Sequence, residues 1–100
     1  MIRGTTVTHT FNVDLKASEI KELKVTYSQG GRIVLFRKLA DCEVTDNTIV
    51  VKLLQEDTFK FDSSKHVNIQ IRVLTNDDQV SSTPILTVSV GACLDNEVLV

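Results

Sequence analysis

The residues of this chain best suited to acid–base chemistry near neutral pH are its two histidines, His9 and His66. A Ser-His-Asp or Cys-His site needs one such histidine beside a nucleophile and an orienting carboxylate. His9 falls in the apolar row of an alternating segment, which favours a structural histidine with hydrogen-bonded ring nitrogens. His66 stands beside a polar loop, and we expect it to be solvated. The sequence therefore predicts no catalytic residue and no enzyme activity.

Metal ligands and paired carboxylates are few and far apart in the sequence. Zinc sites use three or four Cys, His or carboxylate ligands, but Cys42 and Cys93 stand in no Cys-x-x-Cys or Cys/His spacing. Asn76-Asp77-Asp78 could bind calcium with outside ligands, and Glu56-Asp57 could form the carboxylate pair of a glycosidase. A turn rich in Asn and Asp and a capped, solvated turn explain these segments more simply. We predict no metal site and no cofactor, and Gly30-Gly31 fits a hairpin better than a phosphate loop.

The charge balance argues against a nucleic-acid partner. The chain of 100 residues has 11 basic and 13 acidic side chains, for a formal net charge of −2. Nucleic-acid binding draws most of its affinity from Lys and Arg that neutralise phosphates. The basic residues are scattered and form no run, so we expect no nucleic-acid binding, although a basic face assembled by folding stays open as an alternative.

The cysteines and the N-terminus bear on the compartment. Two cysteines permit one disulfide, but free cysteine also behaves as a small buried hydrophobe, so we favour two reduced thiols. No apolar stretch of signal-peptide length follows Met1, and no run approaches the roughly 20 apolar residues that span a membrane. We therefore expect synthesis in the cytoplasm, with exit only by lysis or as part of an assembly, and no membrane partner.

Alternation of apolar and polar residues dominates the chain and predicts β-strands with one face in a core. The clearest inward row is Val67, Ile69, Ile71 and Val73, whose neighbours are polar. Other strands are expected at residues 7–13, 23–28, 33–38, 49–53 and 86–90, with a short edge strand at 41–45.

Between these strands lie turns and one crossing connection. Gly30-Gly31 and Asp46-Asn47 suit tight turns, because these residue types tolerate positive φ angles. Residues 54–61 break the alternation and predict a crossing with one helical turn, which carries Phe59 or Phe61 over the end of the core. Pro84 marks a strand start, a bulge or an edge. About six or seven short strands with frequent turns predict one all-β domain over residues 1–100, an antiparallel β-sandwich.

Three aliphatic residues, Val98, Leu99 and Val100, follow a polar stretch at the end of the sequence. Tails are usually polar, so these side chains need a place to pack. One alternative is that they add to an edge strand of the domain itself. The other is that they contact a neighbouring subunit by strand addition, which makes them the candidate partner-contact residues.

Several segments carry a resemblance to a known group of proteins. Residues 1–11, 21–29, 53–58, 67–74 and 95–99 resemble a family of small uncharacterised proteins of tailed phages and prophages of Gram-positive gut bacteria. The likeness covers nearly the whole chain, and its motifs are structural, so it implies no catalytic residue. The strand–crossing turn–strand pattern also looks like the immunoglobulin-like N-terminal domain of phage baseplate upper proteins, although we expect a stand-alone domain without their receptor-binding extension.

The resemblance implies an immunoglobulin-like β-sandwich that serves as a non-enzymatic structural protein of a phage head, connector or tail and baseplate. Its expected partners are other phage structural proteins or further copies of itself, as a homo-oligomer. Its expected location is the host cytoplasm during assembly, with the virion as a candidate destination. The alternative is a small protein-binding adaptor or regulatory module that works outside the particle.

Overall fold

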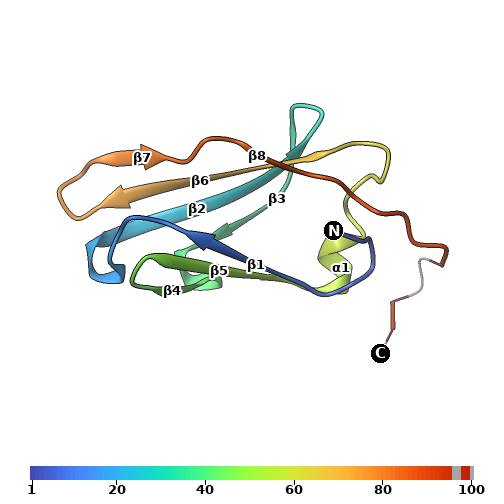
Figure 1. Ribbon diagram of the computed structural model, residues 1–100, viewed down its shortest axis with the longest axis horizontal. Coiled ribbons are helices and arrows are strands. Elements are labelled where there is room, and N and C mark those ends of the chain that lie inside the picture. Colours follow the sequence, from blue (N-terminus) through green and yellow to red (C-terminus); the bar gives the residue numbers. More distant parts are fainter. Residues whose placement is uncertain (96–97, 100) are drawn as a thin grey trace.

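Two antiparallel β-sheets pack face to face in the computed structural model, which describes residues 1–95 and 98–99 (Figure 1). One sheet has the strand order β1-β5-β4, and the other has the order β3-β2-β6-β7, with β8 also paired to β6. The predicted all-β sandwich is therefore confirmed, but the described residues form eight strands and not six or seven, because Val80–Ser82 adds a short strand that was not predicted. The strands are β1 (Val7–Asn12), β2 (Ile20–Gln29), β3 (Arg32–Lys38), β4 (Glu43–Thr45), β5 (Thr48–Leu53), β6 (Val67–Thr75), β7 (Val80–Ser82) and β8 (Leu86–Val88).

Short helical segments connect the strands. The α-helix α1 (Gln55–Thr58) joins β5 to β6, and 3-10 turns lie at Ala17–Glu19 and Leu39–Asp41. Within the described residues, no helix is both long and apolar enough to cross a membrane.

The core consists of the inward rows that the alternation predicted. Val67, Ile69, Ile71 and Val73 of β6 are all buried, and the β5 row Ile49, Val51 and Leu53 faces them across the sandwich with no exposed surface. Each such side chain contributes roughly 1.5–3 kcal/mol by leaving water. The rows confirm the predicted register, because a shift of one residue would turn every one of these side chains to solvent.

The hairpin between β2 and β3 turns at Gly30 and Gly31, whose φ angles are 56° and 78°. Both values lie in the left-handed region that a two-residue hairpin requires and that glycine adopts without strain. Asn47 takes a similar angle of 67° between β4 and β5, as predicted for that turn. The short edge strand is also confirmed, although it covers only Glu43–Thr45.

The crossing connection after β5 closes one end of the sandwich. The single turn of α1 brings Phe61 into the core, where it is 1% exposed, while Phe59 is half-buried beneath the N-terminal residues. The Thr58 hydroxyl donates a hydrogen bond to the Thr5 carbonyl over 2.8 Å. These contacts fix the chain entering β1 against the chain leaving β5, and they confirm the predicted crossing turn.

The last predicted row, Leu86, Val88 and Val90, is only partly correct. Val90 is buried and Val88 half-buried, but Leu86 is 45% exposed. Leu86 pairs with Ile69 at the edge of the five-stranded sheet. It stays exposed because the opposing sheet has only three strands and does not cover the inner face at this edge.

A bulge separates β7 from β8 on this edge. Arg72 and Asn68 are four positions apart on β6, whereas their partners Ser82 and Thr87 are five positions apart. The edge therefore accommodates one extra residue between Ser82 and Thr87. Pro84 lies in this bulge, which is one of the places predicted for it.

Candidate functional site

His9 is tied to a buried tyrosine on the opposite sheet. Its Nδ1 atom lies 2.9 Å from the hydroxyl oxygen of Tyr27, and the two rings stack with centroids 5.7 Å apart. Burial lowers the pKa of His9, with a smaller contribution from the N-terminal charge, and burial raises the pKa of Tyr27. Both rings are thus neutral near pH 7 and form one inter-sheet hydrogen bond, which confirms the predicted structural role of His9.

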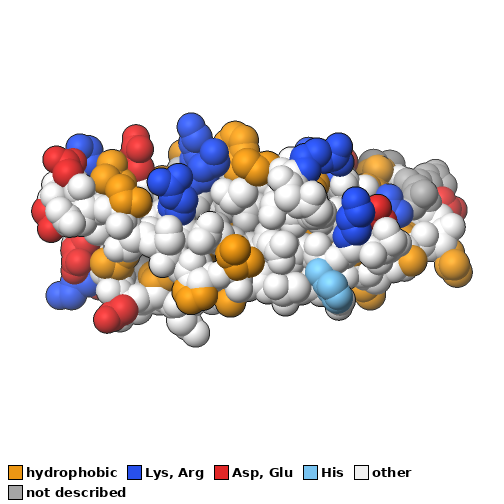
Figure 2. Space-filling model, turned by 90° about the horizontal axis from the view of Figure 1, so that it is seen from above, with side chains coloured by type: hydrophobic (Ala, Val, Ile, Leu, Met, Phe, Trp, Pro, Cys, Tyr) orange, Lys and Arg blue, Asp and Glu red, His pale blue; other side chains and the backbone are white. Residues whose placement is uncertain are grey.

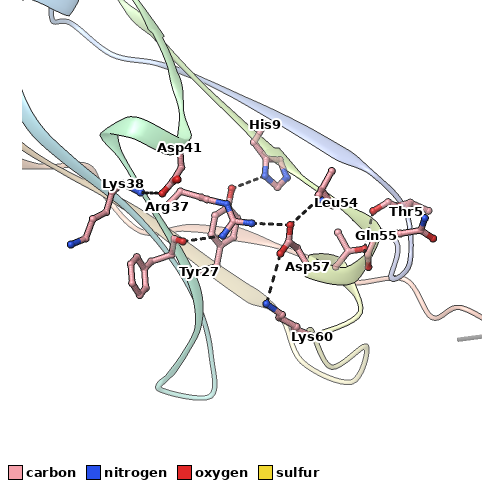
Figure 3. Close-up of polar contacts among 12 residues, drawn as sticks. Thr5, His9, Tyr27, Arg37, Lys38, Asp41, Leu54, Gln55, Asp57 and Lys60 are labelled. Atoms are coloured by element: carbon pink, nitrogen blue, oxygen red, sulfur yellow. Dashed lines mark hydrogen bonds and ion pairs between the residues drawn. The ribbon is translucent and has the colours of Figure 1, made fainter. Parts of the chain in front are cut away.

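Asp57 lies at the centre of a second polar cluster, drawn in Figure 3. Its carboxylate accepts a hydrogen bond from the Leu54 amide at 2.9 Å and lies 2.8 Å from an Arg37 guanidinium nitrogen. Lys60 approaches the other carboxylate oxygen at 3.8 Å. Burial alone raises the pKa of Asp57, but the Leu54 amide and Arg37 outweigh it, so the pKa lies below its usual value. The predicted capped turn is confirmed and Glu56 is exposed, but Asp57 is not solvated as expected, because Arg37 covers its carboxylate.

The remaining polar candidates take structural or solvated positions. His66 is exposed, as predicted. The Asn76 side chain donates to the Ser18 carbonyl at 2.6 Å, and Asp78 pairs with Lys21 at 3.2 Å, so both side chains hold the loop after β6. Among the residues that the structure describes, no group of three or more His, Cys, Asp or Glu side chains could hold a metal ion.

Both cysteines are free and half-buried, as favoured from the sequence. Burial raises the pKa of Cys42 with help from the neighbouring Asp41 carboxylate, so this thiol is protonated at neutral pH. The Cys93 thiol donates to the Asp95 carbonyl at 2.9 Å.

The chain that follows β8 is fixed to the N-terminus before it leaves the sandwich. Residues 89–91 lie parallel to residues 1–3, and the amide of Gly91 donates to the Met1 carbonyl at 2.7 Å. The Arg3 amide in turn donates to the Gly91 carbonyl at 3.0 Å. Gly91 is thereby fixed to the N-terminal residues, and we call residues 92–99 the C-terminal segment.

The described residues of this segment, 92–95 and 98–99, lie beyond α1 at one end of the molecule (Figure 1). Leu94 is fully exposed and Leu99 is 75% exposed. The Gln55 side chain forms a pair of hydrogen bonds with the Leu99 backbone. The Leu99 amide donates to the side-chain oxygen Oε1 of Gln55 at 2.8 Å, and the side-chain nitrogen Nε2 of Gln55 donates to the Leu99 carbonyl. Val98 and Leu99 belong to no strand, so the structure does not add them to an edge of the domain. Val100, the third candidate contact residue, lies outside the described residues.

A basic row crosses the outer face of the five-stranded sheet; the sequence left a basic face assembled by folding open as an alternative but did not identify its residues. Lys24 lies directly opposite Lys38 on β3 and directly opposite Arg72 on β6. The Lys24 ammonium lies 4.4 Å from the centre of the Phe36 ring, while the ion pairs found among the described residues involve other side chains. In Figure 2 Lys and Arg side chains gather left of centre, with hydrophobic side chains on either side.

A groove of about 650 Å³ follows the basic row. Its apolar lining includes Leu39, Leu74 and Val80, of which Val80 is 60% exposed. Lys21 and Glu22 also line the groove, so its charged lining holds more cations than carboxylates beside the apolar surface. This combination suits a ligand carrying both carboxylates and aliphatic groups. Comparisons with protein-family models, with curated proteins and with solved structures find no match to this chain.

Proposed function

We propose that this protein is a non-enzymatic structural component of a tailed-phage or prophage particle and acts through protein–protein contacts. The resemblance of its sequence to a family of phage and prophage proteins is the reason for assigning it to a phage particle. One structural observation supports the mode of action: the C-terminal segment leaves the sandwich with Leu94 and Leu99 exposed. Exposed aliphatic groups on an anchored segment are surface that a partner can bury with a favourable free energy.

The Gln55 contact strengthens this interpretation of the segment. Two hydrogen bonds from one side chain hold the Leu99 backbone while the Leu99 side chain points to solvent. A segment whose backbone is already positioned loses less conformational entropy when a partner binds it. The arrangement therefore suits docking better than it suits packing within the domain.

The proposal includes an immunoglobulin-like fold. Such domains place strands A, B, E and D in one sheet and C, F and G in the other, with C′ beside C in variable-type members. The order β1-β5-β4 corresponds to B-E-D, and β3-β2-β6 followed by β7 and β8 corresponds to C′-C-F-G. Residues 1–3 pair in parallel with the chain after β8, and Tyr27 takes the place of the buried aromatic residue on strand C.

Mass spectrometry of purified particles from a lysogen that encodes the chain tests the proposal. We expect the protein at a fixed ratio to the other particle proteins, and resistant to removal by washing. Its absence from particles, together with capture of one soluble partner from the host cytoplasm, would instead support an adaptor.

A further inference from the structure

We propose that the C-terminal segment of one copy docks in the basic, apolar groove of a second copy. The inference rests on the proposed function only in treating the segment as a partner contact. It adds the identity of the receiving surface and of the partner, which is the chain itself.

The basic row is the first reason. Like charges directly opposite one another on neighbouring strands repel, and Lys38, Lys24 and Arg72 occupy three consecutive strands in this way. Adjacent strands are roughly 4.8 Å apart, so the three cations span roughly 10 Å. An anionic segment across the row relieves this repulsion and gains charge-assisted hydrogen bonds.

The sequence of the C-terminal segment supplies the complementary groups. Residues 94–99 read Leu-Asp-Asn-Glu-Val-Leu, with two carboxylates between aliphatic residues. In an extended chain, Asp95 and Glu97 project to the same side, roughly 7 Å apart. This spacing fits within the span of the basic row, while Leu94 and Leu99 can contact the apolar lining at Leu39, Leu74 and Val80.

The topology keeps the segment out of the groove of its own chain, so the docking that we propose joins two copies. Arg72 lies five residues along β6 from Val67, whose partner Val88 lies three residues before Gly91. These eight residues place Gly91 roughly 27 Å from the basic row along the strand direction. Asp95 comes four residues after Gly91 and reaches at most roughly 14 Å. The segment also starts from the end of the molecule that holds α1, whereas the groove lies toward β7 (Figure 1).

A contact between two different surfaces is heterologous, so it continues from copy to copy as a ring or an open chain. The longest dimension of the molecule is 47 Å, and the segment and the groove lie toward opposite ends of it. Repetition along this axis is the arrangement expected of a subunit that builds a larger assembly.

Sedimentation velocity of the full chain over a range of concentrations tests the docking. We expect concentration-dependent self-association that weakens about tenfold or more in Lys24→Glu/Lys38→Glu and in Asp95→Lys/Glu97→Lys. A mixture of these two variants restores association, because each reversed groove meets a reversed segment. The matched control is Lys16→Glu/Lys52→Glu, which makes the same change in net charge away from the groove and should associate like the parent.

Two results would overturn the inference. One is a parent chain that stays monomeric at about 1 mM, whether or not its basic row binds a single-stranded oligonucleotide. The other is a set of groove variants that associate like the parent. These results do not bear on the proposed function. That proposal fails separately if the protein is absent from particles even though it self-associates in solution.

Discussion

The Arg37 guanidinium lies 2.8 Å from the Asp57 carboxylate, and this ion pair joins strand β3 to helix α1. Neither side chain is more than about a fifth exposed, with 21% for Arg37 and 14% for Asp57. Asp57 also accepts the Leu54 amide hydrogen bond that begins α1. One carboxylate therefore holds the crossing turn in shape and fixes it to the neighbouring sheet.

Replacement of this carboxylate should destabilise the fold. Asp57→Ala removes both the ion pair and the helix cap, and we expect a loss of about 1–3 kcal/mol in the free energy of unfolding, measured with urea. Glu56→Ala is the matched control, because Glu56 is exposed one residue away. Equal stability of the two variants would show that Asp57 does not anchor α1.

The same contact should appear in the acid dependence of stability. The pKa of Asp57 is lowered in the folded protein, so its contribution is complete above the usual carboxyl pKa of about 3.9. The contribution is lost as the pH falls through the lower folded-state pKa. Unfolding free energies measured on the acid side should therefore fall less steeply for Asp57→Ala than for the parent chain.

His9 should add a second pH dependence at higher pH. Its pKa is lowered by burial, so below about pH 6.5 the unfolded chain binds a proton more readily than the folded chain. Stability should thus fall as the pH drops from about 7 toward the folded-state pKa, and His9→Gln should remove this part of the slope. His66→Gln, which changes an exposed histidine, serves as the control and should keep it. A slope unchanged in His9→Gln would contradict the burial of His9 against Tyr27.

The sequence predicted the strands and the core well because burial imposes a period of two on every strand. It did not predict which basic residue of β3 lies beside Lys24, and one bulge explains why. Ser28 pairs with Ile33 but Tyr27 pairs with Leu35, so Val34 is an extra residue in β3. Regular pairing from the Gly30-Gly31 turn would have placed Arg37, not Lys38, opposite Lys24.

The bulge also decides the partner of Asp57. With Val34 inserted, Lys38 joins the outer face and Arg37 turns toward α1. A shift of this kind depends on local backbone geometry, which alternation does not encode. The exposure of Leu86 has a similar origin, because the widths of the two sheets follow from strand pairing and not from the pattern within one strand.

Two glycines with similar backbone angles should differ in their tolerance of a methyl group. Gly4 and Gly31 have φ angles of 76° and 78°, so alanine at either position costs about 1–2 kcal/mol in backbone strain. A Cβ atom at Gly4 would also lie 2.4 Å from the Phe59 ring, whereas at Gly31 it meets nothing within 4 Å. Gly4→Ala should therefore destabilise by about 1–3 kcal/mol more than Gly31→Ala in urea unfolding. Equal losses would mean that Phe59 does not pack under the N-terminus.

A buried charge should test the core register. Ile69→Asp places an unpaired carboxylate where the native side chain is 2% exposed, and we expect no cooperative unfolding transition by circular dichroism. Thr8→Asp is the control, because Thr8 is exposed on β1 opposite Lys52 and should accept the charge. A soluble Ile69→Asp protein with a cooperative melt would refute the register.

The claim that the exposed end of the chain serves a partner is tested most directly by deleting Val98 to Val100. The deletion is assayed in two ways, by the melting temperature of the isolated protein and by incorporation of the protein into particles. We predict an almost unchanged melting temperature together with loss of incorporation. A clear drop in melting temperature with normal incorporation would contradict the account, because it would place these residues in the stability of the domain itself.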